Sequence, residues 1–514
     1  MQKYWYIIGL LVWVSSLMAA VPGFVNPILP YDYSDPDVIR VGDTYLMTSS
    51  SFNNVPGLQI LASKDLVHWE IVDAAIRNRL PGYEDADPNS INGSGASPVL
   101  GNFVWAPSIR EHDGRLYIFY GDPDRGIYCI RSNQISNLQS PMSNFPLLWE
   151  PALLVMPGKG LIDPCPLWDE DGRVWLVHAL AGSRAGLKSV LLMAELNADA
   201  LSVKTPSRII FDGHAEHPTC EGPKLYKRNG YYYIMHPAGG VKTGWQVVQR
   251  SKQIYGPYEL QVTLAQGRTE INGPHQGAWV ETPEGESWFM HFQDVGAAGR
   301  IVHLQPVKWV NDWPEMGFNG EPVIKVASEK LKETGPAWKN FIRRDEFNST
   351  TLALDWQWAG GFIDPKWCFC DTHNSLLRLY SAPQYEDGFM PNMLLQKIPA
   401  SAFSATARVR FSPNDNKKMQ GSEQAGIIVF GRQVFRVEVP VTNEWCYLRL
   451  TMDEHQKGQF FTSSDGKHWT KAGEFFQTVA GYWTGAQVGL FCTRSKTIND
   501  AGWLDVDWFE ITCN

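Results

Sequence analysis

The sequence predicts an all-β protein in which a five-bladed β-propeller is followed by a β-sandwich. Three observations support this fold class. Short β-branched and aromatic runs fill the region from about residue 30 to residue 310, one sequence unit recurs five times there, and no helical period interrupts the chain. Because 514 residues exceed the size at which one core stops growing, two domains are expected.

The strand runs of the first region follow Gly-bearing turns. Examples are 44–48 (TYLMT) after VGD, 115–120 (RLYIFY) after HDG and 173–178 (RVWLVH) after EDG. A tight Gly turn between two strand-forming runs is typical of a β-hairpin. The region is therefore expected to be built from consecutive hairpins.

The recurring unit is a small or charged residue near a proline, a strand, a tight turn and a second strand. The units begin near residues 35, 105, 163, 221 and 275, so successive starts are 70, 58, 58 and 54 residues apart. Each interval is long enough for one four-stranded blade, which predicts five blades. A β-sandwich would contain similar strands without this recurrence.

The other segments complete the domain organisation. Residues 1–20 combine Lys3, a short apolar run and small residues, which predicts a signal peptide cleaved near Ala20; an uncleaved anchor is the alternative. The protein is then exported, to the periplasm or the medium, and no second apolar stretch predicts a membrane span in the mature chain. The propeller covers 21–325, a charged linker 326–342 and a jelly-roll sandwich 343–514.

The composition excludes some classes of partner. The net charge is −9 and no basic stripe is present, so nucleic acid is not expected as a partner and a neutral or weakly charged substrate is favoured. The eight cysteines permit disulfides in an exported protein, but Cys368 and Cys370 are too closely spaced to suggest a zinc site. No feature of the sequence indicates an oligomeric state.

The repeat places several chemically active residues on one axis, because the first strand of each propeller blade lines the central channel. The residues at the starts of the five units are Asp35, Trp105, Asp163, Glu221 and His275. Each Asp-Pro or Glu-Gly-Pro taken alone is an ordinary turn element. Three carboxylates aimed at one axis would repel one another, however, and such a set is more often functional than structural.

The three carboxylates suit acid–base chemistry on a glycosidic bond, which needs a protonated acid on one side and a carboxylate on the other. Glu221, in CEGP, has few polar neighbours in sequence to keep it ionised and is the better acid. Asp35 would serve as the base if it stays ionised, and Asp163 could orient the acid and keep it protonated. Asp37, two residues beyond Asp35, is expected to be structural.

The chain resembles glycoside hydrolase family 43, in particular its β-xylosidase and α-L-arabinofuranosidase members. The resemblance covers essentially the whole mature chain, and the segment from Arg344 onward looks like the concanavalin A-like sandwich of xylosidase-type members. The matching segments are NPILPYDYSDPDVIRVGDTYLMTSSSF (26–52), VWAPSIREHDGRLYIFY (104–120), LIDPCPLWDEDGR (161–173), CEGPKLYKRNGYYYIM (220–235) and GPHQGAWV (273–280).

The resemblance implies an inverting mechanism, with Asp35 as general base, Glu221 as general acid and Asp163 as the residue that tunes the acid. It also implies three further contacts with substrate. Phe52 and Trp105 match aromatic walls of the sugar pocket, and Arg300 matches an arginine that reaches substrate hydroxyls.

No cofactor is required by this chemistry, and a structural calcium ion is the one ion to consider. His275 matches an axial histidine that in some relatives holds calcium or water, so that it is placed among the substrate-binding residues. Asp505 and Asp507 could join Glu346 at a calcium site in the sandwich. The stretch 484–491 (TGAQVGLF) departs from relatives that push an aromatic into the pocket, because Gln487 stands where the aromatic is expected.

The expected function is an exo-acting hydrolase that removes a terminal pentose, β-D-xylose or α-L-arabinofuranose, from plant cell-wall oligosaccharides. Endo-arabinanase or exo-β-galactosidase activity on the same fold is an alternative, as is a sucrose-type transglycosylase that retains configuration. A non-catalytic carbohydrate-binding protein is the alternative from another class.

Overall fold

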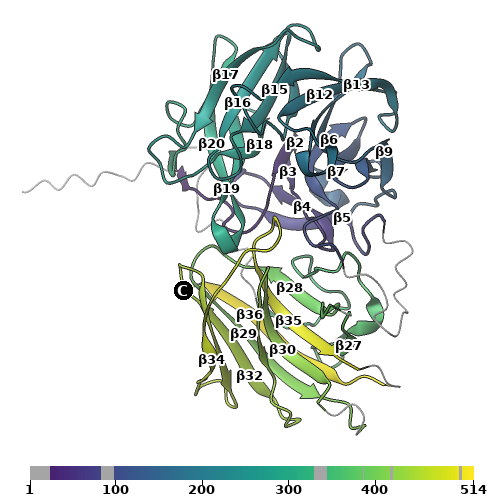
Figure 1. Ribbon diagram of the computed structural model, residues 1–514, viewed down its shortest axis with the longest axis vertical. Coiled ribbons are helices and arrows are strands. Elements are labelled where there is room, and N and C mark those ends of the chain that lie inside the picture. The colour runs from purple at the N-terminus through teal and green to yellow at the C-terminus, as the bar shows by residue number, and fades with distance from the viewer. Residues whose placement is uncertain are drawn as a thin grey trace, which may run out of the picture.

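The computed structural model describes residues 23–82, 98–328, 344–385, 387–416, 421–496 and 500–513 (Figure 1). The segment expected to be a signal peptide lies outside the described residues, as does most of the predicted linker. Within the described ranges no helix is both long and apolar enough to cross a membrane. The prediction of an all-β protein is confirmed.

The first region folds into four-stranded antiparallel sheets. The first sheet contains β2 (Asp37–Val41), β3 (Thr44–Thr48), β4 (Gly57–Ser63) and β5 (Glu70–Ile76). The second contains β6 (Trp105–His112), β7 (Arg115–Asp122), β8 (Gly126–Arg131) and β9 (Leu153–Pro157). The third contains β10 (Leu161–Trp168), β11 (Val174–Leu180), β12 (Val190–Leu196) and β13 (Val203–Asp212).

Two more sheets of the same kind follow. The fourth contains β14 (Lys224–Arg228), β15 (Tyr231–Ala238), β16 (Trp245–Ser251) and β17 (Glu259–Ala265). The fifth contains β18 (His275–Glu281), β19 (Ser287–Asp294), β20 (Arg300–Val310) and β21 (Trp313–Met316). The short helical elements are α1 (Gly182–Ala185) and the 3-10 turns η1 (Pro141–Asn144), η2 (Gly296–Ala298) and η4 (Pro365–Trp367).

The sheets form a closed ring, because each neighbouring pair shares a hydrophobic core. The first sheet packs on the second, the second on the third, and so on to the fifth, which packs back on the first through residues such as Tyr45, Met47 and Met290. Strand β1 (Gly23–Val25) also pairs with β22 (Lys325–Ala327) across the two ends of this region. The start of the predicted linker is therefore part of a strand.

The C-terminal region is a sandwich of two sheets (Figure 1, lower half), as the sequence predicts, and their strands pair antiparallel apart from one short parallel pair. The larger sheet contains β25 (Cys368–Asp371), β26 (Leu376–Tyr380), β36 (Trp503–Cys513), β29 (Phe403–Ser412), β32 (Cys446–Met452), β33 (Lys457–Ser463), β34 (Thr470–Gln477) and β23 (Arg344–Asp345). The other contains β24 (Gln357–Trp358), β28 (Met393–Lys397), β35 (Gln487–Arg494), β30 (Glu423–Phe430) and β31 (Val434–Glu438), with β27 (Ala382–Pro383) beside β35.

The two regions are joined by a polar interface. Side-chain amides of the first sheet and of the sandwich donate to backbone carbonyls across it: Asn53 to Ala359 at 2.5 Å, and Gln357 to Pro56 at 2.7 Å. The loop between β34 and β35 reaches up to the ring, where the backbone N–H of Ala486 donates to the carbonyl of Ala297 at 2.6 Å. The sandwich therefore lies directly against the part of the ring that carries the candidate site.

Candidate active site

The residues singled out in the sequence gather around one cavity of about 90 Å³. The seven predicted site residues that line it are Asp35, Phe52, Trp105, Asp163, Glu221, His275 and Arg300. Five further residues line it too, namely Ala106, Ile162, Val241, Gln276 and Trp483. All but one come from the ring, and Trp483 comes from the sandwich.

The starts of the ring's inner strands share an unusual backbone conformation. Asp35 and Asp163 both have φ 56°, and Ala106, Gly222 and Gln276 are also left-handed. In three sheets this position coincides with a bulge in the pairing of the first two strands. A left-handed residue other than glycine is strained, and such residues concentrate at functional sites.

This conformation corrects the alignment of the five repeat units. Asp35 and Asp163 occupy the left-handed position itself, whereas Trp105, Glu221 and His275 each lie one residue before it. The expectation that all five are equivalent is thus wrong by one residue for three of them. The offset has a chemical consequence, because the two aspartates and the glutamate enter the cavity from different points along their strands.

Asp35 is held by two side chains. The hydroxyl of Ser50 donates to its Oδ2 at 2.5 Å, and Nη1 of Arg300 lies 3.5 Å from its Oδ1. Ser50 in turn accepts the backbone N–H of Ala106 at 2.7 Å, which ties Asp35 to the second sheet. These contacts hold both carboxylate oxygens of Asp35 in place at the edge of the cavity.

Asp163 is almost completely buried and accepts the backbone N–H of Gly222 at 2.7 Å. Burial raises the pKa of Asp163 well above its usual value, and the negative charges of Glu221 and Asp35 act in the same direction. The N–H of Gly222 and the charge of Lys224 oppose this shift. Asp163 therefore retains its proton at a pH where an isolated aspartate would have lost it.

Glu221 is the most exposed of the three acids, with 25% of its side-chain surface accessible. Its Oε1 lies 3.0 Å from Nε2 of His275, a residue only 1% exposed. This contact fixes one carboxyl oxygen and leaves the other toward the cavity. His275 therefore orients the acid, and nothing in its described surroundings gathers metal ligands around it.

The aromatic walls come from two sheets and from the sandwich. Phe52 is buried, and its backbone pairs with Val104 just before β6. Trp105 is anchored by its indole N–H, which donates to the carbonyl of Gly101 at 2.7 Å. The ring of Trp483 packs edge-on against Trp105 with centroids 6.1 Å apart. Apolar ring faces of this kind suit the C–H faces of a sugar.

Trp483 is the functional candidate that sequence reasoning missed. It is 56% exposed, has φ 64°, and lies 5.8 Å from the guanidinium carbon of Arg300. The resemblance places the expected aromatic at Gln487, but the sandwich places Trp483 at the pocket instead, just before the stretch 484–491. Gln487 is instead 5% exposed at the start of β35, inside the interface. The aromatic pair Tyr482–Trp483 in a Gly-flanked loop was the available signal.

Trp483→Ala is expected to lower kcat/KM for an unsubstituted disaccharide by roughly 10-fold, mainly through KM, since the variant loses an aromatic contact at the mouth of the cavity. Steady-state kinetics on that substrate measure the effect. Phe475→Ala is the matched control, because Phe475 is 65% exposed on β34 and does not line the cavity. Equal kinetic constants for both variants and the wild type would remove Trp483 from the site.

Asp37 is structural, as expected. Its carboxylate is fully buried, and Oδ2 accepts the backbone N–H of Ile109 and Nη1 of Arg110, each at 2.7 Å. Those contacts join the first sheet to the second sheet. Asp37 does not line the cavity, so of the two neighbouring aspartates only Asp35 can reach a bound substrate.

Asp163→Asn is expected to raise the thermal stability of the protein at pH 7 while it lowers activity. Because the folded pKa of Asp163 is raised, its contribution to stability is fully present below the unfolded pKa and is lost as pH rises through the folded value. The variant avoids this loss, so a Tm gain of roughly 2–4 °C is expected at pH 7 and none near pH 3.5. Activity is expected to fall at every pH. Calorimetry and kinetics across pH test both, and a lower Tm at pH 7 would contradict the argument.

The carboxylates proposed for a calcium site in the sandwich face arginines instead. Asp505 pairs with Arg378 at 2.7 Å and with Arg410 at 2.9 Å. Asp507 pairs with Arg408, and Glu346 with Arg344. Among the described residues no group of three or more His, Cys, Asp or Glu could hold a metal ion. All eight cysteines are described, and each is unpaired.

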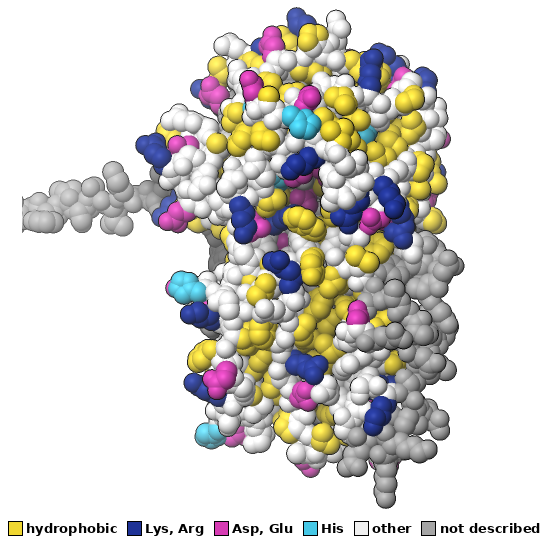
Figure 2. Space-filling model, in the orientation of Figure 1, with side chains coloured by type: hydrophobic (Ala, Val, Ile, Leu, Met, Phe, Trp, Pro, Cys, Tyr) yellow, Lys and Arg dark blue, Asp and Glu magenta, His cyan; other side chains and the backbone are white. Residues whose placement is uncertain are grey.

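The surface around the cavity carries charges of both signs. On the face shown in Figure 2, Lys and Arg side chains are interspersed with Asp and Glu and form no single-sign stripe. This arrangement suits a neutral substrate better than a polyanion. It agrees with the small, aromatic-walled shape of the cavity.

The cavity combines three carboxylates in different surroundings, a histidine beside the most exposed of them, and aromatic walls. This combination defines a glycoside hydrolase site. Residues 24–314 match the model of glycosyl hydrolases family 43, and residues 344–444 and 432–512 match the β-xylosidase C-terminal concanavalin A-like domain. The chain belongs to glycoside hydrolase family 43. The resemblance noted in the sequence is thereby confirmed, and the protein is an enzyme that hydrolyses glycosidic bonds.

Individual relatives extend over nearly the whole chain. A putative β-xylosidase of Xylanibacter ruminicola is 35% identical over 90% of this chain and 85% of its own. A non-reducing end α-L-arabinofuranosidase of Bacteroides ovatus is 26% identical over 99% of this chain and 98% of its own. The structure of the family 43 protein BlXynB from Bacillus licheniformis is similar with TM-score 0.77 and 25% identity, over 96% of this chain and 100% of that one.

Proposed function

We propose that the protein is an exported, exo-acting, inverting hydrolase that releases a terminal pentose, β-D-xylose or α-L-arabinofuranose, from plant cell-wall oligosaccharides. Its ring of sheets is a five-bladed β-propeller that carries the catalytic residues, and the sandwich completes the pocket. Relatives named β-xylosidase and α-L-arabinofuranosidase support the choice of a pentose.

The observation that carries this proposal is the shape and lining of the cavity. All three carboxylates open into a space of about 90 Å³, and the exposed ring of Trp483 stands beside it. A small pocket with an aromatic at its mouth accommodates one sugar ring, not the interior of a chain. Exo action on a terminal residue follows from that restriction.

The roles of the acids follow from their surroundings. Glu221 protonates the leaving oxygen, since it is the acid nearest to solvent and is oriented by His275. Asp35, beside Arg300 and Ser50, activates the water on the opposite face of the sugar. Asp163, whose own pKa is raised by burial and by its neighbours, is the nearby carboxyl that tunes the acid.

A panel of nitrophenyl glycosides tests the function. Release of nitrophenol from the β-D-xyloside or the α-L-arabinofuranoside, together with release of only monosaccharide from longer oligosaccharides, is the expected result. Release of mainly long products would indicate endo action of the arabinanase type, and release from the galactoside alone would indicate a β-galactosidase. Binding of oligosaccharide with no release from any substrate would leave a non-catalytic carbohydrate-binding protein.

A further inference from the structure

One buried carboxylate joins three segments of the chain behind the cavity. Asp32 is 9% exposed and precedes the first sheet. Its Oδ1 accepts the backbone N–H of Arg300 at 2.9 Å and the hydroxyl of Ser34 at 3.2 Å, while Oδ2 accepts the backbone N–H of Gly485 at 2.8 Å. Arg300 begins β20 in the ring, and Gly485 belongs to the sandwich loop before β35.

Both N–H groups belong to segments that supply walls of the cavity. The side chain of Arg300 reaches Asp35 at 3.5 Å, so that the backbone of Arg300 sets where its guanidinium lies. Trp483 is two residues before Gly485, and its ring lies against that same guanidinium. The carboxylate of Asp32 therefore holds the backbone of Arg300 directly, and it holds the loop of Trp483 at Gly485, two residues further on.

The three segments meet so closely that only glycine fits. A Cβ on Gly299 would lie 2.5 Å from Oδ1 of Asp32 and 2.7 Å from the nitrogen of Gly485, and a Cβ on Gly485 would lie 2.9 Å from the carbonyl of Ala298. Contacts this tight leave little freedom for the loop to move while the carboxylate keeps both bonds. The two backbone bonds from Arg300 and Gly485 to Asp32 thus form a clamp that fixes the loop.

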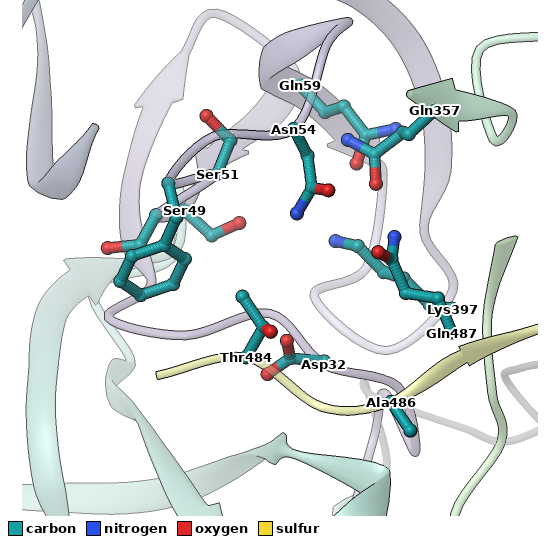
Figure 3. A pocket seen from close by; sticks show the side chains of 12 residues that line it. Asp32, Ser49, Ser51, Asn54, Gln59, Gln357, Lys397, Thr484, Ala486 and Gln487 are labelled. Carbon is teal, nitrogen blue, oxygen red and sulfur yellow. The ribbon is translucent and has the colours of Figure 1, made fainter. Parts of the chain in front are cut away.

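Lys397 supplies the opposite charge on the sandwich side. It ends β28, pairs in register with Gln487 at the start of β35, and its Nζ lies 3.5 Å from the centre of the Tyr33 ring. Its side chain and that of Asp32 line the same buried polar cavity (Figure 3). Burial lowers the pKa of Lys397 to about 8, and the charge of Asp32 opposes that change. Burial likewise raises the pKa of Asp32, and the charge of Lys397 opposes that change, so each group partly offsets the cost of burying the other.

We infer that Asp32 is a positioning residue, which holds the sandwich's Trp483 loop and Arg300 in place against the sugar site, with Lys397 as its counter-charge. The inference rests on the proposed function and deepens it. The sandwich then contributes Trp483 to the pocket, and the hydrogen bond from Gly485 to Asp32 of the ring sets where Trp483 lies. Because the loop is already held in place, less conformational entropy is lost when substrate binds.

Asp32→Asn tests the inference in the full-length protein. The amide keeps the shape but offers an N–H where one of the two backbone donors needs an acceptor. We expect kcat/KM for a disaccharide to fall roughly 10- to 100-fold, because misplacing a substrate contact by about 1 Å has effects of that size. The loss should be smaller than 10-fold when Asp32→Asn is added to Trp483→Ala, since both changes disturb the same wall.

Asp73→Asn is the matched control. Asp73 is completely buried, accepts the backbone N–H groups of Ala74 and Leu147, each at 2.8 Å, and does not line the cavity. This control should lower Tm and leave the kinetic constants of the folded enzyme unchanged. If Asp32→Asn lowers only Tm, as Asp73→Asn should, Asp32 is merely structural and the inference is overturned. The inference is also overturned if the fold-losses of kcat/KM for Asp32→Asn and Trp483→Ala multiply in the double variant.

Lys397→Met gives a second test should Asp32→Asn fail to fold. Removal of the counter-charge weakens the clamp without breaking its two bonds, so kcat/KM should fall roughly 3- to 10-fold with an unchanged product pattern. An unchanged kcat/KM would overturn the inference. Failure of the proposed function is distinguishable, because the wild type would then release nothing from the xyloside or arabinofuranoside.

Discussion

Glu221→Gln is expected to lower kcat on an unactivated xylo-oligosaccharide by about 10²–10⁴-fold while substrate binding survives. The amide keeps the size and the contact with His275 but has no proton to give to the leaving oxygen. A nitrophenol leaves without such help, so the loss on a nitrophenyl glycoside should be much smaller. The dependence of the loss on the leaving group is the mark of a general acid.

Parallel kinetics on the two substrates, with calorimetric titration of a xylo-oligosaccharide, measure this effect. Glu259→Gln is the matched control, because Glu259 is exposed on the outer strand β17, where it pairs with Arg250, and does not line the cavity. The same fold-loss on both substrates would show that Glu221 is not the acid. Loss of binding together with turnover would show that the glutamine disturbs the pocket.

Asp35→Asn is expected to lower kcat by a similar factor, about 10²–10⁴-fold, but to the same extent on both substrates. Every glycoside needs an activated water, whatever its leaving group, and the asparagine cannot take the proton of that water. The substitution also removes the electrostatic attraction between the Asp35 carboxylate and Arg300. Because Asp35 lies at a left-handed position that asparagine tolerates well, the fold should be preserved.

Asp37→Asn separates the chemical role from the structural one. That change removes the ion pair with Arg110 and should lower Tm while kinetic constants of the folded enzyme stay within a few-fold of the wild type. Circular dichroism melts and kinetics of both variants measure the contrast. A large kinetic loss in Asp37→Asn with a small one in Asp35→Asn would reverse the assignment of the base.

The fold could be predicted from the sequence because its signals are local. Strand runs bounded by Gly turns, as at Thr44–Thr48, reflect preferences that each hairpin satisfies alone. The fivefold recurrence of those hairpins then predicted that the sheets are arranged in a ring. The pairing of β1 with β22 was not predictable, because it joins segments at least 300 residues apart and neither has a pattern of its own.

The sequence predicted which residues belong to the site, but not how they are positioned. The motifs identified the residues that line the cavity, yet the one-residue offset between Asp163 and Glu221 depends on a bulge that sequence patterns do not reveal. Trp483 was missed because a loop of the sandwich has no fixed position until the two regions pack together. Likewise, nothing near Asp32 in sequence indicates that it binds a loop more than four hundred residues away.

The configuration of the first product tests the central assignment most directly. With Asp35 as base and Glu221 as acid, one displacement by water inverts the anomeric centre. Proton NMR during the first moments of β-xyloside hydrolysis should therefore show α-D-xylose before mutarotation, or the β-anomer from an α-L-arabinofuranoside. Initial release of the retained anomer would mean that a carboxylate acts as nucleophile, and it would contradict the roles assigned to all three acids.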